Sequence, residues 1–255
     1  MFKRLNLAWL KKMNKPWILY FTRSNGLKCL VLFLTIFLLG TAYSIFLSKS
    51  LPAGRLLAPQ KTIVIDPGHG GIYDRGVVHK ESGVAESPIN LAVSMELKQI
   101  LERQGYNVIL TREAESQEYR EIQPELRRRV NLAESSNADI LISIHVNQYP
   151  DPSCFGAQTF YNAANTESQR LALLIQEELV KLEPNNHRKA LPKDLFILRE
   201  SKMPSVLVEV GFISNPNDRQ RLQDPTHRQQ LAKAIADGIR RYFNNEEVKP
   251  VLELE

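Results

Sequence analysis

The chain has 255 residues, and its content of 43% hydrophobic and 24% charged residues is typical of a folded protein, which excludes a disordered chain. The formal net charge of +5 is concentrated in the first 28 residues, where seven lysines and arginines occur before any acidic residue. The remainder of the chain is slightly acidic. Because a nucleic-acid-binding domain needs a basic face on the folded domain, we expect no nucleic-acid partner.

An uncharged apolar run extends from Cys29 to Leu47. A helix of this length, at about 1.5 Å per residue, nearly matches a hydrocarbon core of about 30 Å. By the positive-inside rule, residues 1–28 are then a cytoplasmic tail, residues 29–48 a single transmembrane anchor, and the rest lies outside the cell membrane. A cleaved signal peptide is the alternative, since Ala42-Tyr43-Ser44 offers a cleavage site, but the long leading region favours an uncleaved anchor.

Residues 49–60, with two prolines and a glycine, are typical of a linker. Over residues 61–244, short β-rich apolar runs alternate with helical periods. This pattern predicts one α/β domain of three layers, with a mostly parallel central sheet flanked by helices, followed by a charged tail at 245–255. The strands we expect are residues 62–66, 107–111, 140–145, 157–161, 195–198 and 205–210.

Apolar residues recur at helical spacing in four segments between or after these strands, and their apolar stripes predict core. One helix ends at Gly105, and a second begins at Pro124. Thr166 and Gln169 form a capping box that begins a third helix, and the last helix follows Pro225.

Polar residues stand where three of the expected strands end, at the sheet edge where ligands bind in open parallel sheets. His69 follows the first strand in a glycine-rich loop, His145 ends the third, and Glu209 lies near the end of an otherwise apolar strand. A single histidine in such a place is usually structural, but a buried carboxylate is costly unless it is paired or metal-linked. Two histidines and carboxylates at one edge predict a catalytic zinc, which takes three protein ligands and leaves a fourth position open.

Glu86 is the favoured third ligand, because Pro88 and the apolar period after it place Glu86 at a helix N-terminus beside the first loop. His79 and Glu81 remain alternatives, since spacing alone does not exclude them. The chain has no His-Glu-x-x-His, Cys-x-x-Cys or Gly-x-Ser-x-Gly motif. Thermolysin-like, zinc-finger and serine-hydrolase interpretations are therefore excluded.

Four sequence blocks occur in the order Ile63–Gly71, Glu86 before Asn90-Leu91, Ala138–Asn147, and Pro204–Asn215. Together they resemble the zinc-dependent N-acetylmuramoyl-L-alanine amidases of the amidase 3 family, and the resemblance covers essentially residues 61–243. It implies that zinc is bound and that the substrate is peptidoglycan, which these enzymes cut between muramic acid and L-alanine. The residues it assigns to zinc are His69, Glu86 and His145, and it makes Glu209 the catalytic glutamate.

Further candidates for substrate contact are Asn147, Arg75 and the segment Arg127–Arg129. Asn147 lies two residues after a proposed zinc ligand and could orient His145 or bind substrate, and Arg75 could meet a substrate carboxylate. The segment Arg127–Arg129 is more typical of a solvated helix face. The loop after Gly71 departs from the family's usual sequence, which puts its geometry in question but leaves the metal site unaffected.

The stretches Arg128–Ala133, Ser153–Tyr161 and Ile239–Phe243 are similar to the spore-cortex subgroup of that family. This similarity implies a role in muramic-δ-lactam formation and germination, at the forespore envelope. A housekeeping autolysin, a zinc deacetylase and a non-catalytic peptidoglycan-binding domain of the same fold are the alternatives. The residues leave open whether an accessory lipoprotein or a second copy of the chain binds the domain.

Overall fold

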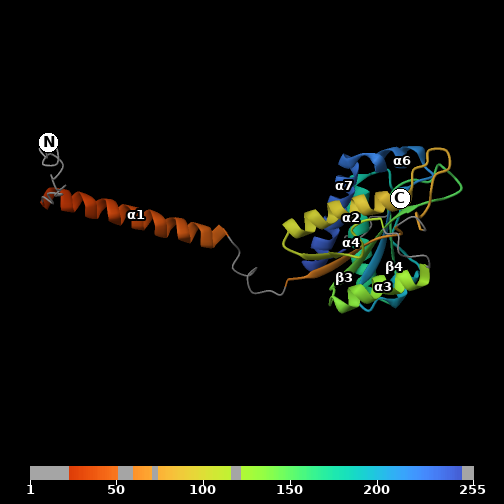
Figure 1. The fold of residues 1–255 in the computed structure, drawn as a ribbon, viewed down its shortest axis with the longest axis horizontal. Helices are drawn as coiled ribbons and strands as arrows, with labels where there is room; N and C mark the ends of the chain where they lie inside the picture. Colours follow the sequence, from red (N-terminus) through yellow and green to blue (C-terminus); the bar gives the residue numbers. More distant parts are fainter. Residues whose placement is uncertain (1–22, 51–59, 71–73, 116–121, 249–255) are drawn as a thin grey trace, which may run out of the picture. The chain divides into compact units, whose positions relative to one another are not determined.

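The computed structural model describes residues 23–50, 60–70, 74–115 and 122–248 (Figure 1). Most of the expected cytoplasmic tail, most of the linker and the end of the charged tail lie outside these residues. The chain divides into two units, Met1–Pro59 and Gln60–Glu255.

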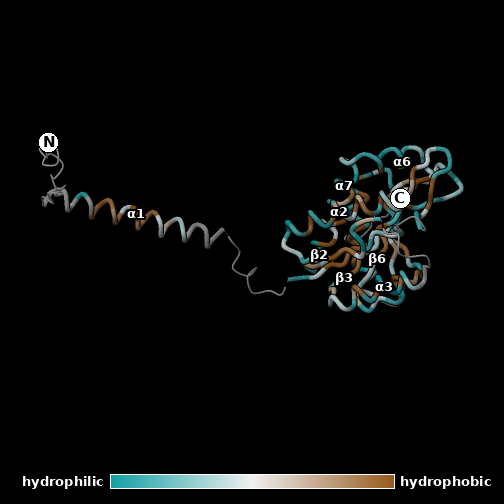
Figure 2. Tube along the Cα trace, viewed as in Figure 1, coloured by the Kyte–Doolittle hydropathy of each residue, from teal (hydrophilic) through white to brown (hydrophobic). Residues whose placement is uncertain are grey.

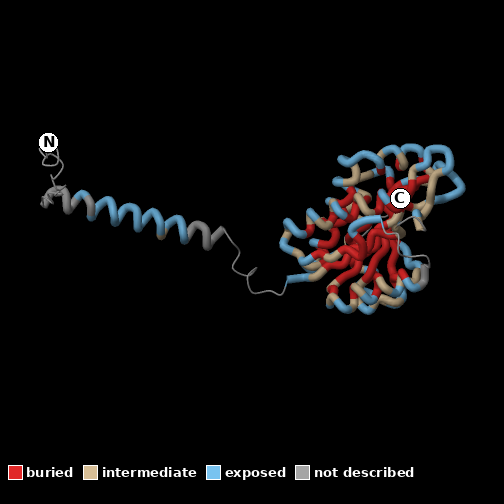
Figure 3. The backbone as a smooth tube through the Cα atoms, viewed as in Figure 1, coloured by how far each residue is buried: buried red, intermediate tan, exposed pale blue. Residues whose placement is uncertain are grey.

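In the first unit, helix α1 spans Arg23–Ser50, and its large apolar side chains between Leu30 and Tyr43 are exposed (Figures 2 and 3). The side chains of Cys29 and of residues 45–50 are outside the described part of the anchor segment. Among the described residues, no helix is both long enough and apolar enough to cross a membrane.

The second unit is built on a six-stranded sheet in the order β2-β1-β3-β6-β4-β5. All neighbouring strands are parallel except β4 and β6, which are antiparallel. The strands are β1 (Thr62–Pro67), β2 (Asn107–Leu110), β3 (Ile140–Asn147), β4 (Gln158–Tyr161), β5 (Leu191–Pro192) and β6 (Ser205–Phe212). The expected α/β domain with a mostly parallel sheet is therefore confirmed.

Helices cover both faces of the sheet (Figure 1). They are α2 (Glu86–Arg103), α3 (Ile122–Ser135), α4 (Thr166–Leu182), α5 (Phe196–Glu200), α6 (Pro216–Gln223) and α7 (Pro225–Phe243). Strand side chains alternate between two cores, so that Ile63 and Ile65 of β1 pack with α2, α4 and α7, while Val64 packs with α3 and α5. Gly238 lets α7 approach α4 closely, since a Cβ there would lie 2.6 Å from the Ile175 Cα.

Two local predictions were wrong. The expected strand at 195–198 is the start of α5, where Leu198 and Arg199 donate their amides to the Leu195 carbonyl. A short apolar run fits a buried helix as well as a strand, and periodicity alone does not separate the two. The third helix is capped by Asn165 in place of the expected Thr166, because the Asn165 side chain accepts a hydrogen bond from the Ser168 amide.

Helix boundaries otherwise follow the expected signals closely. Helix α2 is followed by Gly105 in a left-handed conformation, and α3 begins at Ile122, two residues before Pro124. The short helix α6 was not expected; Asn215 caps it by accepting amide hydrogen bonds from Asn217 and Asp218, and Pro216 opens it. Because β1, β3 and β6 are parallel neighbours, their carboxyl ends meet at one edge of the sheet.

Candidate active site

The loop after β1 brings His69 over the sheet edge. His69 has a φ of 59° and Gly70 a φ of 134°, so the backbone turns sharply at these two residues. Glycine adopts a positive φ without strain, whereas a histidine does so only at a cost. Gly68 packs against the imidazole of His145, where a Cβ would lie 2.2 Å from two ring atoms. The absence of a side chain at position 68 is therefore what lets the two histidines approach each other.

Glu86 is the first residue of α2, and its carboxylate is buried. Its Oε2 accepts a hydrogen bond from the Val77 amide at 2.9 Å, and its Oε1 accepts one from the Val146 amide at 3.1 Å. Burial opposes ionisation of Glu86, but the hydrogen bonds and charges of His145 and His69 outweigh it and hold its pKa well below the ordinary value. Glu86 is thus an anion fixed in position by two separate segments of backbone.

The structure brings His69, Glu86 and His145 together. The Glu86 Oε1 lies 3.0 Å from His145 Nδ1 and 3.4 Å from His69 Nε2, and one ligand atom from each residue lies within 4.8 Å of the others. Tetrahedral zinc with bonds of about 2.0–2.1 Å separates its ligand atoms by about 3.3 Å. Among the described residues, these three form the group of side chains that could hold a metal ion. The two distances to Glu86 Oε1 are close to the zinc spacing.

Asp74 orients His69 and was missed by the sequence analysis. Its Oδ1 lies 2.6 Å from His69 Nδ1, which leaves Nε2 directed to Glu86 and available to a metal. Burial opposes protonation of His69, but Asp74 and Glu86 outweigh it and raise the pKa of His69 to about 10. The same negative charges attract a metal cation. The sequence signal that could have identified Asp74 is an acidic residue a few positions after a histidine in a loop.

Glu209 lies beside His145, because the two residues are direct partners in the register of β6 and β3. It is buried, and its Oε2 has no hydrogen-bond partner within the described part of the chain. Burial raises the pKa of Glu209, with Glu86 adding to the effect and His145 opposing it. A carboxylate with a raised pKa and a free oxygen next to a metal-binding group is suited to accept and return a proton.

A cleft of about 210 Å³ opens beside this group on the α3 and α5 side of the sheet. Helices α3 and α5 form its walls, and side chains of β1, β3 and β6 form its floor. Its lining residues are Asp66, His69, Asp74, Glu125, Leu126, Arg129, Ser143, His145, Leu195, Phe196, Ile197 and Leu207. A larger hollow of about 630 Å³, which includes Phe155 and Arg221, contains none of the candidate site residues and is open to solvent.

The remaining candidates do not join the group. The Asn147 side chain accepts a hydrogen bond from the Gln148 amide, and Arg75 is exposed. His79 bonds the Ser82 hydroxyl and lies 3.2 Å from the exposed Glu81. Substrate contact by Asn147 or Arg75 stays a prediction, and the geometry favours Glu86 over His79 and Glu81 as third ligand.

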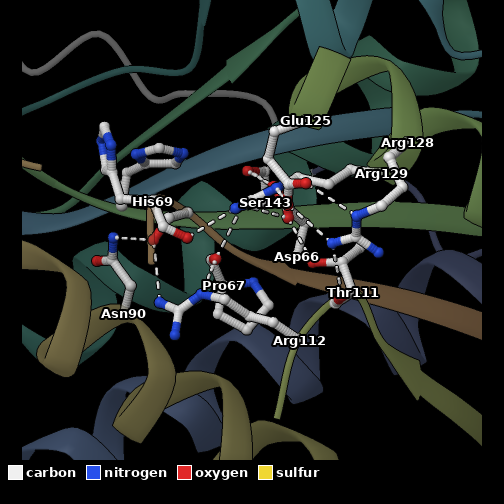
Figure 4. Close-up of polar contacts among 12 residues, drawn as sticks. Asp66, Pro67, His69, Asn90, Thr111, Arg112, Glu125, Arg128, Arg129 and Ser143 are labelled. Carbon is white, nitrogen blue, oxygen red and sulfur yellow. Dashed lines mark hydrogen bonds and ion pairs between the residues drawn. The ribbon is translucent and has the colours of Figure 1, made fainter. Parts of the chain in front are cut away.

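The segment Arg127–Arg129 is not uniformly solvated, which corrects that expectation for Arg129. Arg127 is exposed, but Arg129 is buried against Asp66 at 2.9 Å and Glu125 at 2.9 Å (Figure 4). Arg112, to which no role was assigned, is buried beside it. Burial of these guanidinium groups under the site was not visible in the sequence, because an arginine triplet on a helix is usually a solvated face.

Comparison with known proteins now identifies the family. Residues 63–241 match the family model described as N-acetylmuramoyl-L-alanine amidase. The germination-specific N-acetylmuramoyl-L-alanine amidase of Bacillus subtilis is 35% identical over 227 residues, which are 81% of this chain and 93% of that protein. The amidase LytC of B. subtilis is 35% identical over 187 residues, which are 72% of this chain and 36% of LytC.

Among solved structures, the CwlD amidase of Clostridioides difficile in complex with the GerS lipoprotein is 37% identical. The match has a TM-score of 0.70 and covers 73% of this chain and all of that one. An N-acetylmuramoyl-L-alanine amidase of Clostridium difficile 630 matches at 31% identity with a TM-score of 0.67, covering 73% of this chain and 98% of that one. This chain belongs to the amidase 3 family of N-acetylmuramoyl-L-alanine amidases.

Proposed function

We propose that this amidase uses zinc, held by His69, Glu86 and His145, to hydrolyse the amide between N-acetylmuramic acid and L-alanine in peptidoglycan. The observation that carries the proposal is the convergence of these three side chains beside the buried carboxylate of Glu209, whose Oε2 has no hydrogen-bond partner among the described residues. Membership of the family supports the same substrate bond.

The arrangement of the side chains indicates the role of each group in the proposed reaction. Zinc, when bound, supplies a Lewis acid that polarises the amide carbonyl and lowers the pKa of water. Asp74 holds the Nδ1 side of His69, and two backbone amides hold Glu86, so the ligand atoms are oriented in advance. Glu209 accepts a proton from the attacking water and passes it to the leaving amine of L-alanine, as a general base and then a general acid.

Removing one ligand should abolish tight zinc binding. His69→Ala, Glu86→Ala and His145→Ala each dismantle a three-ligand site, so purified protein should lose its one equivalent of zinc by atomic absorption. His79→Ala, His187→Ala and His227→Ala are matched controls and should keep the metal. Full occupancy in Glu86→Ala, with loss in Glu81→Ala or His79→Ala, would place the third ligand in the loop instead.

The Glu209→Gln variant should separate zinc binding from catalysis of amide hydrolysis. The amide is nearly isosteric but is not a base, so zinc and fold should be retained while turnover falls by about two to four orders of magnitude. Mass spectrometry of peptide-bearing wall fragments measures this as release of intact L-alanyl peptides. Glu113→Gln, at an exposed position, is the control. Near-normal turnover in Glu209→Gln would refute the role, and release of acetate by the unaltered protein would indicate a deacetylase.

We also propose that residues 29–48 anchor the domain to the cell membrane, with residues 1–28 in the cytoplasm. The uncharged run, its basic flank and the helical conformation of α1 support this topology. Protease added to protoplasts should then digest the domain while leaving the N-terminal tail protected. Protection of the domain until the membrane is lysed would contradict the proposal.

The biological setting we propose is the spore cortex. The similarity to the germination-specific amidase of B. subtilis, along most of both chains, supports it, and an anchor would confine cleavage to wall near the membrane. In the solved CwlD complex the amidase is bound to the GerS lipoprotein, so we include an accessory lipoprotein in the proposal. A pull-down of the full chain from sporulating cells that recovers no lipoprotein would remove that part.

Deletion of the gene should leave vegetative growth normal and yield spores that germinate poorly. Removal of stem peptides exposes muramic residues for deacetylation and ring closure, so muropeptide analysis of these spores should find no muramic-δ-lactam. The Glu209→Gln variant should reproduce the deletion. Chained vegetative cells with an unchanged lactam content would favour a housekeeping autolysin.

A further inference from the structure

Three consecutive backbone carbonyls, at the end of β1 and the start of the His69 loop, accept hydrogen bonds from two buried arginines. Figure 4 shows these arginines, Arg112 and Arg129, beside Pro67 and His69. The Pro67 carbonyl accepts hydrogen bonds from Arg112 Nε at 2.9 Å and from Arg129 Nη1 at 3.0 Å. The Gly68 carbonyl accepts one from Arg112 Nη2 at 3.1 Å, and the His69 carbonyl accepts one from Arg129 Nη2 at 2.7 Å. We call Arg112 and Arg129 the carbonyl clamp.

Arg112 also reaches the segment that carries Glu86. Its Nη2 donates to the Ser87 carbonyl at 3.0 Å and lies 3.2 Å from the Ser87 hydroxyl. Asn90 makes a second connection between the same two segments, because its Nδ2 donates both to the Gly68 carbonyl and to Glu86 Oε1. One guanidinium therefore joins the backbone next to two proposed metal ligands.

Arg129 ties the same loop to the sheet and to α3. It shares Asp66 with the Thr111 hydroxyl at 2.6 Å and the Ser143 hydroxyl at 2.7 Å, so the Asp66 carboxylate connects β1 to β3, on which His145 lies. Glu125 accepts a further hydrogen bond from Arg129 Nε at 2.9 Å. Two carboxylates thus offset the Arg129 charge, which would otherwise repel a cation at the site.

The loop needs such a constraint. A non-glycine residue at φ of 59° is strained, and the glycines on either side of His69 have no side chains to restrict the backbone. A metal that binds a mobile ligand must order it on binding, which weakens affinity, whereas a loop held in advance avoids that cost. Lysine cannot replace the clamp, because its single ammonium lacks the planar fork that serves several carbonyls at once.

We propose that Arg112 and Arg129 are positioning residues that set the metal affinity of the site, by fixing the backbone of residues 67–69 and its distance from Glu86. This inference rests on the proposed zinc function. It predicts that the clamp acts on the bound metal before any substrate is present.

The test measures zinc affinity of the detergent-solubilised full chain by competition with a chromophoric chelator, for Arg112→Lys, Arg129→Lys and the control Arg127→Lys. Arg127 is an exposed arginine of the same helix α3, and its described hydrogen bond goes to Glu200 Oε2 at 2.8 Å, away from the loop. Both clamp variants should bind zinc about 10- to 100-fold more weakly, the range seen when groups that orient metal ligands are removed. Arg127→Lys should stay within about twofold of the unaltered chain, because it leaves the ligand-orienting contacts in place.

Circular dichroism and thermal unfolding of the zinc-free proteins separate positioning from folding. Should Arg129→Lys fail to fold, Arg112→Lys carries the test alone. Folded clamp variants with unaltered zinc affinity, or an equal loss in Arg127→Lys, would overturn the clamp. If the unaltered chain itself binds no zinc, the proposed function fails instead, so the two failures are distinguishable.

Discussion

The carboxylate of Glu86 receives hydrogen bonds from the amides of Val77 and Val146 and lies within 3.4 Å of a nitrogen of His69 and of His145. Burying a carboxylate to this extent costs free energy unless its oxygens are hydrogen-bonded and its charge is compensated. The two amides satisfy its oxygens, and the histidines, or a cation held among them, supply the compensation. The loop before α2, the end of β3 and the loop after β1 are therefore all constrained by one group.

The position of the site follows from the alternation of side chains in the sheet. Odd and even residues of β1 enter different cores, and the face toward α3 and α5 becomes polar at the carboxyl ends of the strands. Asp66, Ser143 and His145 all line the cleft on that face. The opposite face stays apolar against α2, α4 and α7, so the rigidity of the larger core supports the strands from which the polar residues project.

Charge under the site is arranged to tolerate a metal ion. Burial would raise the pKa of Asp66, but Arg129 with the Thr111 and Ser143 hydroxyls outweighs it and keeps the carboxyl ionised. The Asp66 charge in turn offsets that of Arg129, so the arginine can hold the loop carbonyls without adding a net positive charge below His69. Glu209, with burial raising its pKa, is the carboxylate of this region best suited to exchange a proton.

The sequence by itself determined the elements and residues whose signals are local. The strands that carry His145 and Glu209, the glycine-rich loop of His69 and the helix start at Glu86 were all predictable, because strand and helix-start signals act over a few residues. Both strands end further along the chain than predicted, two residues beyond His145 and three beyond Glu209. Only the tertiary structure decided that 195–198 forms a helix. The periodicity of so short an apolar run does not distinguish a helix from a strand. The packing of Ile197 and Leu198 in the second core decides in favour of the helix.

The tertiary structure also decided which polar residues support the site. Arg129 donates to the carbonyl of His69 from 60 positions further along the chain, and Arg112 to that of Gly68 from 44 positions. Nothing in the local sequence distinguishes them from solvated arginines. Their burial arises because β1 lies between β2 and β3 in the sheet, which places Arg112, two residues after β2, and the inner face of α3 beneath the same loop. Strand order is set by long-range packing, so the sequence pointed to the proposed metal ligands, while the fold decided which residues hold them in place.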